Sequence, residues 1–384
     1  MAHPQSRPAS PGASFRSGRR PKGLLIAAMA LAMGLAAAAF AVQQGIAHRP
    51  MRDVLDMPVP AGEFNKRSPA SSVARQGDRL VAVGPRGLIV LSTDGGSHWA
   101  QMSSPVQSDL VSVRFSDAST VWAVGHDAVA LRSTDGGANW QRVLDGRSLL
   151  KLLRGHYPAQ GGPEGADKTR EEVERWASQS ATPDVLPTPF LDVSFADAND
   201  GFLVGAFGLV LHTVDGGKTW VPWIEHTDNP RRLHLYAVGG HGAQRYIAGE
   251  QGLLLRLDAA RSHFALVKTP YEGTFFGVDV RPGRVLAYGL SGNAYVSNDE
   301  GAQWRKLATG TDASLVAAVP ASGEGLLLVS DAGHVLSVSP DGSRAVPLQI
   351  PYTSEVLGAA TTASGQLVLA LVNGLRVLDI TPAR

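Results

Sequence analysis

The chain has 384 residues with 43 Gly, 24 Pro and no Cys, and its formal net charge is +1. Because it has no cysteine, a disulfide scaffold, a thiolate zinc site, an iron–sulfur cluster and a cysteine nucleophile are excluded. A hydrophobic content of 44% with 18% charged residues predicts a folded chain with a sizeable core. The near-zero charge disfavours nucleic acid as a partner, and the glycine excess predicts many tight turns between short strands.

The N-terminal segment has the layout of an export signal. Residues 1–41 contain basic residues but no acidic ones, and an uninterrupted apolar run extends from Leu24 to Val42. Ala39-Phe40-Ala41 offers a small-x-small cleavage site, while the length of the run also suits an uncleaved membrane span. We therefore expect residues 1–41 to be a signal peptide or an N-terminal membrane anchor and residues 42–52 to be a linker. The rest of the chain should be exported to the periplasm, free or anchored to the inner membrane.

The remaining chain repeats a short motif, V-G-x-x-G-x-V-L-x-S/T, seven times in more or less intact form. Successive copies start about 41 residues apart, once one long interval is counted as a repeat plus an insertion. The first glycine position of the copies falls at Gly84, Gly125, Gly205, Gly249, Gly289, Ser330 and Leu371. Such a period indicates one supersecondary unit per repeat.

Each unit can be read as four short strands. In the second unit, turn residues separate the runs Leu110–Phe115, Val121–Val124, Val129–Ser133 and Trp140–Val143. Four strands per unit are typical of a propeller blade, and the units lack the amphipathic pattern that a helix pair needs. The sequence therefore predicts an all-β, seven-bladed β-propeller over residues 53–384.

A second motif, S/T-x-D-x-G-x-x-W, falls at the turn between the third and fourth strands of four units. This is the Asp-box, or BNR repeat. Its hydroxyl and carboxylate can bond backbone N–H groups within the turn, glycine permits positive φ, and tryptophan can cover the turn. We expect these residues to be structural and not catalytic. They are Ser92, Asp94, Gly96, Trp99, Ser133, Asp135, Gly137, Trp140, Thr213, Asp215, Gly217, Trp220, Ser297, Asp299, Gly301 and Trp304.

The two ends of the predicted propeller indicate how the ring could close. The seventh unit stops after its third strand, around Leu375–Ile380, which would leave a sheet edge exposed. The segment Asp53–Val59 precedes the first unit and has no other strand partner. We therefore predict that it supplies the fourth strand of the last blade.

An insertion at residues 145–188 separates the outer strand of blade 2 from the inner strand of blade 3. Thr169 and Glu172 have the spacing of a capping box, and Glu171 and Arg175 that of an i,i+4 pair, so the insertion is expected to be mainly helical. Its Trp176 and leucine pairs could pack on the propeller rim or could form a partner-binding surface. An insertion of this length usually carries function.

The insertion should emerge on the face that also collects the turns between second and third strands and the loops between blades. That face mixes aromatic side chains with charges of both signs, a composition that suits protein recognition. The partner-binding candidates are Arg86, Tyr157, Trp176, Arg231, Arg232, Tyr271 and Tyr352.

The Asp-box units, the blade motif and the export signal together resemble the photosystem II assembly/stability factor family over roughly residues 53–384. The resemblance implies a monomeric, non-catalytic binding or assembly factor outside the cytoplasm, in the periplasm or its thylakoid-lumen equivalent. Its partner would be a protein, namely an integral membrane complex engaged through the insertion-bearing face. It implies neither a cofactor nor a nucleic acid partner.

A periplasmic Asp-box glycoside hydrolase of the sialidase type is the alternative. It would need facing carboxylates, for which Glu250, Glu272, Asp331 and Glu355 are candidates. The sequence lacks the F/Y-R-I-P-type segment that introduces the first arginine of sialidases, and sialidases have six blades. We find no metal-binding histidine pair and no phosphate-binding glycine loop in a strand-to-helix setting, so no metal or cofactor is expected.

Overall fold

The computed structural model describes residues 52–163, 165–260, 262–321, 325–351 and 353–380. The chain divides into two units, Met1–Arg52 and Asp53–Arg384. The expected signal or anchor (residues 1–41) lies outside the described residues, so the structure gives no account of it. In the part that is described, no helix has the length and apolar character needed to cross a membrane.

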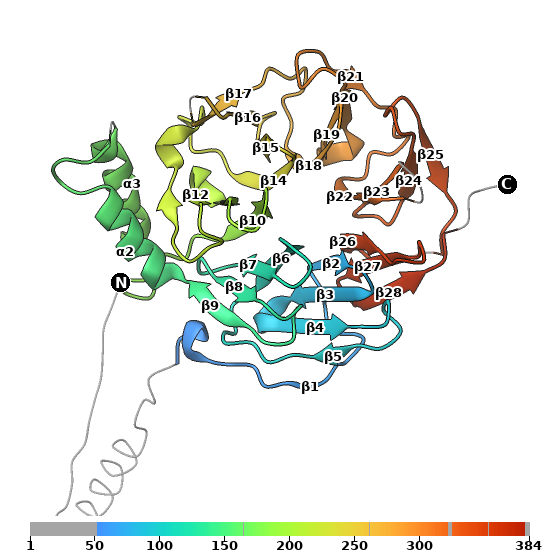
Figure 1. Cartoon of the computed structure of the whole chain (residues 1–384), viewed down its shortest axis with the longest axis horizontal. Coiled ribbons are helices and arrows are strands. Elements are labelled where there is room, and N and C mark those ends of the chain that lie inside the picture. The colour runs from blue at the N-terminus through green and yellow to red at the C-terminus, as the bar shows by residue number, and fades with distance from the viewer. Residues whose placement is uncertain (1–51, 164, 261, 322–324, 352, 381–384) are drawn as a thin grey trace, which may run out of the picture. The chain divides into compact units, whose positions relative to one another are not determined.

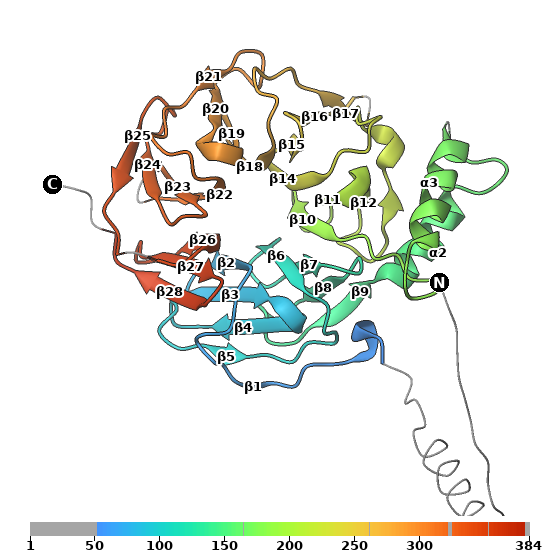
Figure 2. The same cartoon turned by 180° about the vertical axis from the view of Figure 1, so that it is seen from behind.

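The second unit consists of seven antiparallel sheets arranged radially around one axis, as Figures 1 and 2 show from opposite sides. Their innermost strands, β2, β6, β10, β14, β18, β22 and β26, pack side by side around that axis. A mainly helical insertion lies between the second and third sheets. The prediction of an all-β, seven-bladed propeller is therefore confirmed.

The strands follow the repeat closely. Blade 1 contains β1 (Gly62–Glu63), β2 (Ser72–Gln76), β3 (Arg79–Gly84), β4 (Leu88–Ser92) and β5 (Ala100–Gln101). Blade 2 contains β6 (Leu110–Phe115), β7 (Val121–Gly125), β8 (Ala130–Ser133) and β9 (Gln141–Leu144). Blade 3 contains β10 (Phe190–Phe195), β11 (Gly201–Gly205), β12 (Val210–Thr213) and β13 (Val221–Pro222). Blade 4 contains β14 (Leu235–His241), β15 (Gln244–Gly249), β16 (Leu254–Asp258) and β17 (His263–Leu266). Blade 5 contains β18 (Phe275–Arg281), β19 (Arg284–Gly289), β20 (Ala294–Ser297) and β21 (Arg305–Lys306). Blade 6 contains β22 (Leu315–Pro320), β23 (Leu326–Ser330), β24 (Val335–Val338) and β25 (Ala345–Leu348). Blade 7 contains β26 (Val356–Thr361), β27 (Leu367–Leu371) and β28 (Gly374–Leu378).

The second strand of each blade forms the core, because it is covered by a neighbouring blade on both faces. In β3, Leu80 and Ala82 pack toward blade 7, whereas Val81 and Val83 pack toward blade 2. A strand buried on both faces gains from apolar residues at every position. This explains why the repeated motif is apolar throughout its centre rather than alternating.

Tight turns join the second strands to the third strands, and three of them are short 3-10 turns: η2 (Pro85–Gly87), η3 (Ala206–Gly208) and η5 (Leu290–Gly292). Each places a non-glycine residue in the left-handed region at its centre, with φ of 57° at Arg86 and Phe207 and 53° at Ser291. The loops between blades emerge at the same ends of the sheets, since backbone bonds such as Ala206 N–H to Pro189 O join turn and loop. We call this side the insertion-bearing face.

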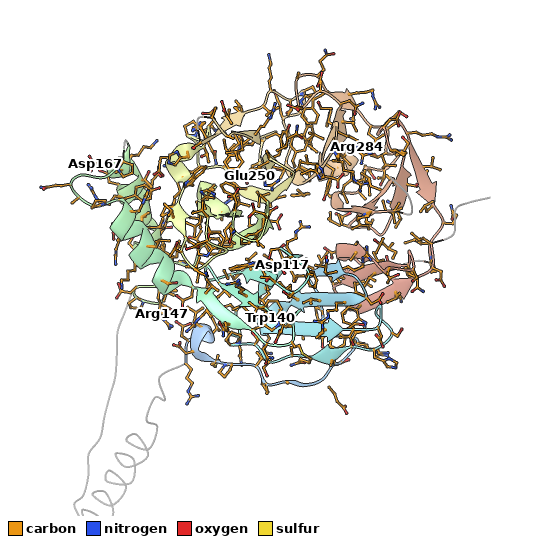
Figure 3. The ribbon with its side chains drawn as sticks, viewed as in Figure 1. Asp117, Trp140, Arg147, Asp167, Glu250 and Arg284 are labelled. Atoms are coloured by element: carbon orange, nitrogen blue, oxygen red, sulfur yellow. The ribbon has the colours of Figure 1, made fainter. Side chains whose placement is uncertain are left out.

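The prediction that Asp53–Val59 completes the last blade is wrong. Val54–Asp56 is a 3-10 turn (η1), Val59 pairs with Ser104, and β1 adds a fifth strand outside β5 in blade 1. Within the described residues, blade 7 has three strands. The segment is held at blades 1 and 2 by the burial of Leu55, which is 1% exposed, and by the Arg147 ion pairs with Asp53 and Asp56. Figure 3 shows Arg147 at the start of the insertion.

Blade 7 meets blade 1 through side chains. Ala360, Val368 and Ala370 of blade 7 pack against Leu80 and Ala82 of blade 1 in one buried cluster. The Ala70 N–H also donates to Leu371 O across this seam. The ring is therefore closed by the same face-to-face packing that joins the other blades.

The insertion forms two helices, α2 (Gly146–His156) and α3 (Ala166–Ser178), that lie outside the ring beside blade 3 (Figure 1). The expected capping box at Thr169 and Glu172 is wrong, because α3 begins at Ala166 with Gly165 as its N-cap, so that Thr169 lies inside the helix. A capping box does occur in α2, where Asp145 and Ser148 exchange bonds with each other's backbone N–H.

Candidate functional site

The Asp-box residues make their bonds inside their own turn. Ser92 Oγ donates to Asp94 Oδ1 and accepts from Gly96 N–H, both at 2.8 Å. Asp94 Oδ1 also accepts from His98 N–H at 2.9 Å, and Trp99 Nε1 donates to Gly96 O at 3.0 Å. The serine-to-aspartate and glycine-to-hydroxyl bonds recur at Ser133, Thr213 and Ser297.

These local bonds keep the box carboxylates ionised. Bonds from the Thr219 hydroxyl and backbone N–H lower the pKa of Asp215 to about 2. A carboxylate with so low a pKa, held by its own turn, is a poor general acid near neutral pH. The geometry thus gives these side chains a structural task on the face opposite the insertion-bearing one.

Several box turns also accept bonds from the preceding blade. Arg79 of blade 1 donates to Asp135 O in the box of blade 2 at 2.7 Å. Arg284 and Arg305 of blade 5 donate to backbone carbonyls of residues 339–343, in the degenerate box of blade 6. Figure 3 labels Arg284 on blade 5. The turn therefore links neighbouring blades as well as closing its own strand pair.

The insertion-bearing face carries an apolar collar around the axis. In six blades the first strand has a register shift after its first residue, which leaves one extra residue at each shift. All six extra residues are apolar or aromatic: Val111, Leu191, Tyr236, Phe276, Val316 and Leu357. Five are half-buried and Leu357 is 38% exposed. Since inner strands of successive blades lie side by side, the six residues form an interrupted apolar ring.

An aromatic row leads from this collar to the insertion. Phe276 packs edge-on against Tyr236, and Tyr236 in turn against His234, with ring centroids 5.4 and 6.5 Å apart. His234 contacts Phe207 at 4.9 Å. Phe207 stacks on Trp176 of α3 at 5.6 Å. Five aromatic rings from four separate segments thus form one surface.

Phe207 is the most unusual member of this row. Its side chain is 40% exposed although it is large and apolar, and its backbone is in the left-handed region at φ 57°. Both properties are unfavourable for phenylalanine in a turn. Arg86 and Ser291 share this backbone conformation at the equivalent turns. It is therefore the exposure of a large apolar ring that marks Phe207 and this part of the face as a candidate site.

Two predicted partner contacts are instead internal. Tyr157 is 1% exposed, and its hydroxyl donates to Glu225 Oε2 at 2.5 Å. Burial, together with this bond, raises the pKa of Tyr157. Arg232 ion-pairs with Glu172 at 2.8 Å and donates to Thr169 Oγ1, so it fastens α3 to blade 4. The prediction for Tyr157 is wrong because the insertion buries this ring in the core, and Arg232 is occupied by α3.

The remaining candidates are spread over the face. Arg86 and Arg231 are exposed, and Arg231 donates to Gln251. Tyr271 is half-buried beside Phe275, and its hydroxyl donates to Leu290 O. Trp176 is half-buried in the aromatic row. Tyr352 lies outside the described residues.

The four carboxylates that a hydrolase could use share no hydrogen bond with one another among the described residues. Glu250, labelled in Figure 3, accepts from His234 N–H at 2.8 Å. No contact joins it to Glu272, Asp331 or Glu355 in the described part of the chain, and the same part contains no group of three or more residues able to hold a metal. Near the axis the exposed Arg114 of blade 2, whose side chain is 57% exposed, pairs with the buried Asp192 of blade 3 at 3.0 Å, and Asp192 raises the pKa of Arg114.

Radial blades, box turns linked to their neighbours and an apolar collar define a seven-bladed Asp-box β-propeller with a helical insertion. The family model described as photosynthesis system II assembly factor YCF48 matches residues 74–150 and 169–270. The resemblance to the photosystem II assembly factor family is therefore shown, and it extends across blades 1 to 4.

Two curated relatives carry the name Photosystem II assembly lipoprotein Ycf48. The protein from Synechococcus sp. (strain CC9902) is 32% identical over 128 residues, which cover 32% of this chain and 38% of the relative. The protein from a strain of Prochlorococcus marinus is 63% identical over 30 residues, 8% of this chain and 9% of the relative. The chain thus aligns with much less than two thirds of either relative. They are named lipoproteins, whereas this chain contains no cysteine.

Solved structures show the same fold. YCF48 bound to a D1 peptide has a TM-score of 0.57 at 14% identity and covers 84% of this chain and 96% of its own. YCF48 from Cyanidioschyzon merolae gives 0.55 at 14% identity, covering 83% and 98%. Streptogramin B lyase gives 0.61 at 10% identity, covering 86% and 100%. Because identities are low and a lyase is among them, these likenesses show the fold alone.

Proposed function

We propose that the protein is a non-catalytic binding factor that assists the assembly of a membrane protein complex outside the cytoplasm. It engages that complex through its insertion-bearing face. The observation that carries the proposal is the aromatic row that runs from Trp176 through Phe207 to the apolar collar. Exposed aromatic residues next to a charged rim are the usual anchors of protein–protein contacts.

The family resemblance supports this role. Both curated relatives are named as assembly proteins, and one solved relative of the same fold was captured with a D1 peptide. A polypeptide partner is therefore the best-supported ligand class for this chain. The four candidate carboxylates give no comparable support to a glycosidase.

The export-signal layout of residues 1–41 supports a location outside the cytoplasm, with the propeller, residues 53–384, as the exported domain. Within that domain we propose residues 145–188 as the insertion that shapes the binding face. The expected linker, residues 42–52, would separate the propeller from the membrane or from the cleavage site.

The test is co-purification of the tagged protein from detergent-solubilised membranes of the source organism, with cross-linking to locate the contact. We expect an integral membrane complex that is retained by the natural protein and lost from Phe207→Ser and Phe276→Ser. The control is Val214→Ser, which removes a 68% exposed apolar side chain at an Asp-box turn. Equal capture by all three variants, or cross-links confined to the Asp-box face, would overturn the proposal.

A further inference from the structure

A groove of about 570 Å³ lies between the insertion and the rim of the propeller. One wall is α2, and the others are β9 of blade 2 and β13 of blade 3, which contacts α2. Figure 1 shows α2 beside β9. Its apolar lining comes from all three elements: Val143, Leu144, Leu152, Trp220, Val221 and Pro222. Val221 is 46% exposed, so the floor is open to solvent.

The amphipathic pattern of α2 explains why the groove exists. Leu149, Leu150 and Leu153 are buried against blade 3 and anchor the helix. The adjacent stripe, with the exposed Lys151 and the half-buried Leu152, borders the short outer strand β13 and lines the groove. The helix thus covers one side of the sheet edge and leaves a trough beside it.

The charged groups around the groove give it a positive rim. Lys151 and Lys218 are exposed, and neither makes an ion pair or a side-chain hydrogen bond with the described residues. His156 is already bonded to Glu225 at 2.8 Å. The nearby acidic groups are also engaged, Asp145 with Arg142 and its own helix, and Asp215 with its Asp-box turn. Across the described part of the rim, the two lysine ammonium groups are therefore the uncompensated charges.

Trp220, in the wall of the groove, lacks the hydrogen bond that the tryptophans of the other intact Asp-boxes make. The corresponding tryptophans Trp99, Trp140 and Trp304 donate their indole N–H to a glycine carbonyl of their own box. Trp220 is 5% exposed, and its Nε1 has no hydrogen-bond partner among the described residues. A buried donor without an acceptor costs free energy, so the indole N–H of Trp220 is less well satisfied than those of the other three box tryptophans.

We propose that this groove binds an acidic, apolar segment of a partner polypeptide. The apolar side chains would occupy the floor, and the carboxylates would pair with Lys151 and Lys218. The charges decide the occupant, because a basic or uncharged segment would leave both lysines unpaired at the rim. The inference rests on the proposed function as a polypeptide-binding factor and adds the chemistry of one segment of its partner.

The probe is a labelled peptide, acetyl-Asp-Leu-Val-Leu-Asp-amide, compared with acetyl-Lys-Leu-Val-Leu-Lys-amide and acetyl-Asp-Gly-Ser-Gly-Asp-amide. Binding is measured by fluorescence anisotropy, and its location by the indole N–H signals in ¹⁵N-tryptophan spectra, assigned for Trp220 with Trp220→Phe. We expect the first peptide to bind best and to shift the Trp220 signal. Lys151→Glu with Lys218→Glu should weaken it about tenfold, as expected when two partly exposed ion pairs become repulsive.

Lys168→Glu is the matched control, since Lys168 is an exposed lysine of the same insertion but lies outside the groove. It should bind the peptide as the natural protein does. Three results would overturn the inference: an unshifted Trp220 signal, equal affinity for the basic peptide, or unchanged affinity in the double variant with intact Trp122 and Trp140 signals. If the acidic peptide does not bind in the groove while capture of a membrane complex still depends on Phe207, the proposed function stands. If capture fails, the proposed function falls whatever the peptide does.

Discussion

Blade 1 and blade 7 face each other across the seam of the ring, yet in the described chain one has five strands and the other three. The N-terminal segment adds its strand to the blade that already has four and leaves the incomplete blade as it is. Closure therefore does not depend on strand exchange between the two ends of the propeller. It depends on the fit of two sheet faces, as at every other blade junction.

The outer sides of the third strands, β4 in blade 1 and β28 in blade 7, differ accordingly. In blade 1 the carbonyl of Ile89 accepts from Met102 N–H, and Leu91 pairs with Ala100. In blade 7 the two-residue turn at residues 372–373 pairs Leu371 with Gly374, so that Leu375 and Val377 turn their backbone groups outward. No described segment bonds to them. The third strand of blade 1, β4, is thus covered by β5, whereas the third strand of blade 7, β28, has no backbone partner on its outer side among the described residues.

The largest expected effect tests whether the seam packs as well as an ordinary junction. Leu80→Ala at the seam and Leu369→Ala between blades 6 and 7 each truncate a side chain that is 0% exposed. We expect both to lower the free energy of unfolding by about 2–5 kcal/mol, measured by urea denaturation. A loss at Leu80 several-fold below that at Leu369 would mean that the seam is the loose junction of the ring.

A smaller effect is expected where the N-terminal segment crosses blade 7. Gly374 has φ of 127°, and a Cβ there would lie 1.9 Å from Lys66 O. We expect Gly374→Ala to cost about 1–3 kcal/mol through backbone strain and displacement of residues 66–67, seen as a lower midpoint in thermal unfolding. Gly310→Ala is the control, because Gly310 also has positive φ but open space around it. Equal losses at both sites would show that the crossing is not held tightly.

Hydrogen exchange compares the outer sides of β4 and β28 in the natural protein, without a substitution that would change its stability. The amides of Leu375 and Val377 should exchange much faster than those of Ile89 and Leu91, because only the latter pair faces a partner strand. The measurement is amide exchange followed by NMR or mass spectrometry of the full chain. Strong protection at Leu375 and Val377 would mean that another segment covers β28 in solution.

The smallest expected effect is the loss of local stability in the Asp-box turns when the pH is lowered. The pKa of Asp215 and that of Asp135 are lowered to about 2, from 3.8. A carboxyl whose pKa is depressed by folding stabilises the fold above its unfolded value and loses that contribution as the pH falls through its folded value. Protection of the Gly137 and Gly217 amides, corrected for intrinsic rates, should therefore decline between about pH 4 and pH 2. Val368 of blade 7, whose described strands carry no intact box, should not follow them; a parallel decline there would indicate global unfolding instead.

The repeat made the fold predictable from the sequence, whereas the position of Asp53–Val59 could not be predicted. Period, turn residues and Asp-boxes are local, so blade number and strand positions follow from sequence. Asp53–Val59 alternates apolar residues as a strand would, but its place depends on Arg147, whose position is set by the insertion. A pairing that depends on a distant helix has no local signature.

The candidate site was only partly predictable. Trp176 was found because tryptophan is conspicuous in an insertion. The collar was missed, because a register shift is a property of pairing, although the doublets Leu235-Tyr236 and Phe275-Phe276 interrupt strand alternation and could have indicated it. The burial of Tyr157 could not be predicted, because nothing in the sequence around it shows that Glu225, far along the chain, accepts the hydrogen bond of its hydroxyl.

The arginine contacts with the box turns all run in one direction around the ring, from one blade to the next blade in the sequence. Arg79 reaches forward from blade 1 to blade 2, and Arg284 and Arg305 reach forward from blade 5 to blade 6. Damage to a box should therefore weaken the blade before it as well as its own blade, while the blade after it is spared. At such junctions neighbouring blades form coupled pairs, so a blade transplanted into another propeller would need its successor's turn to come with it.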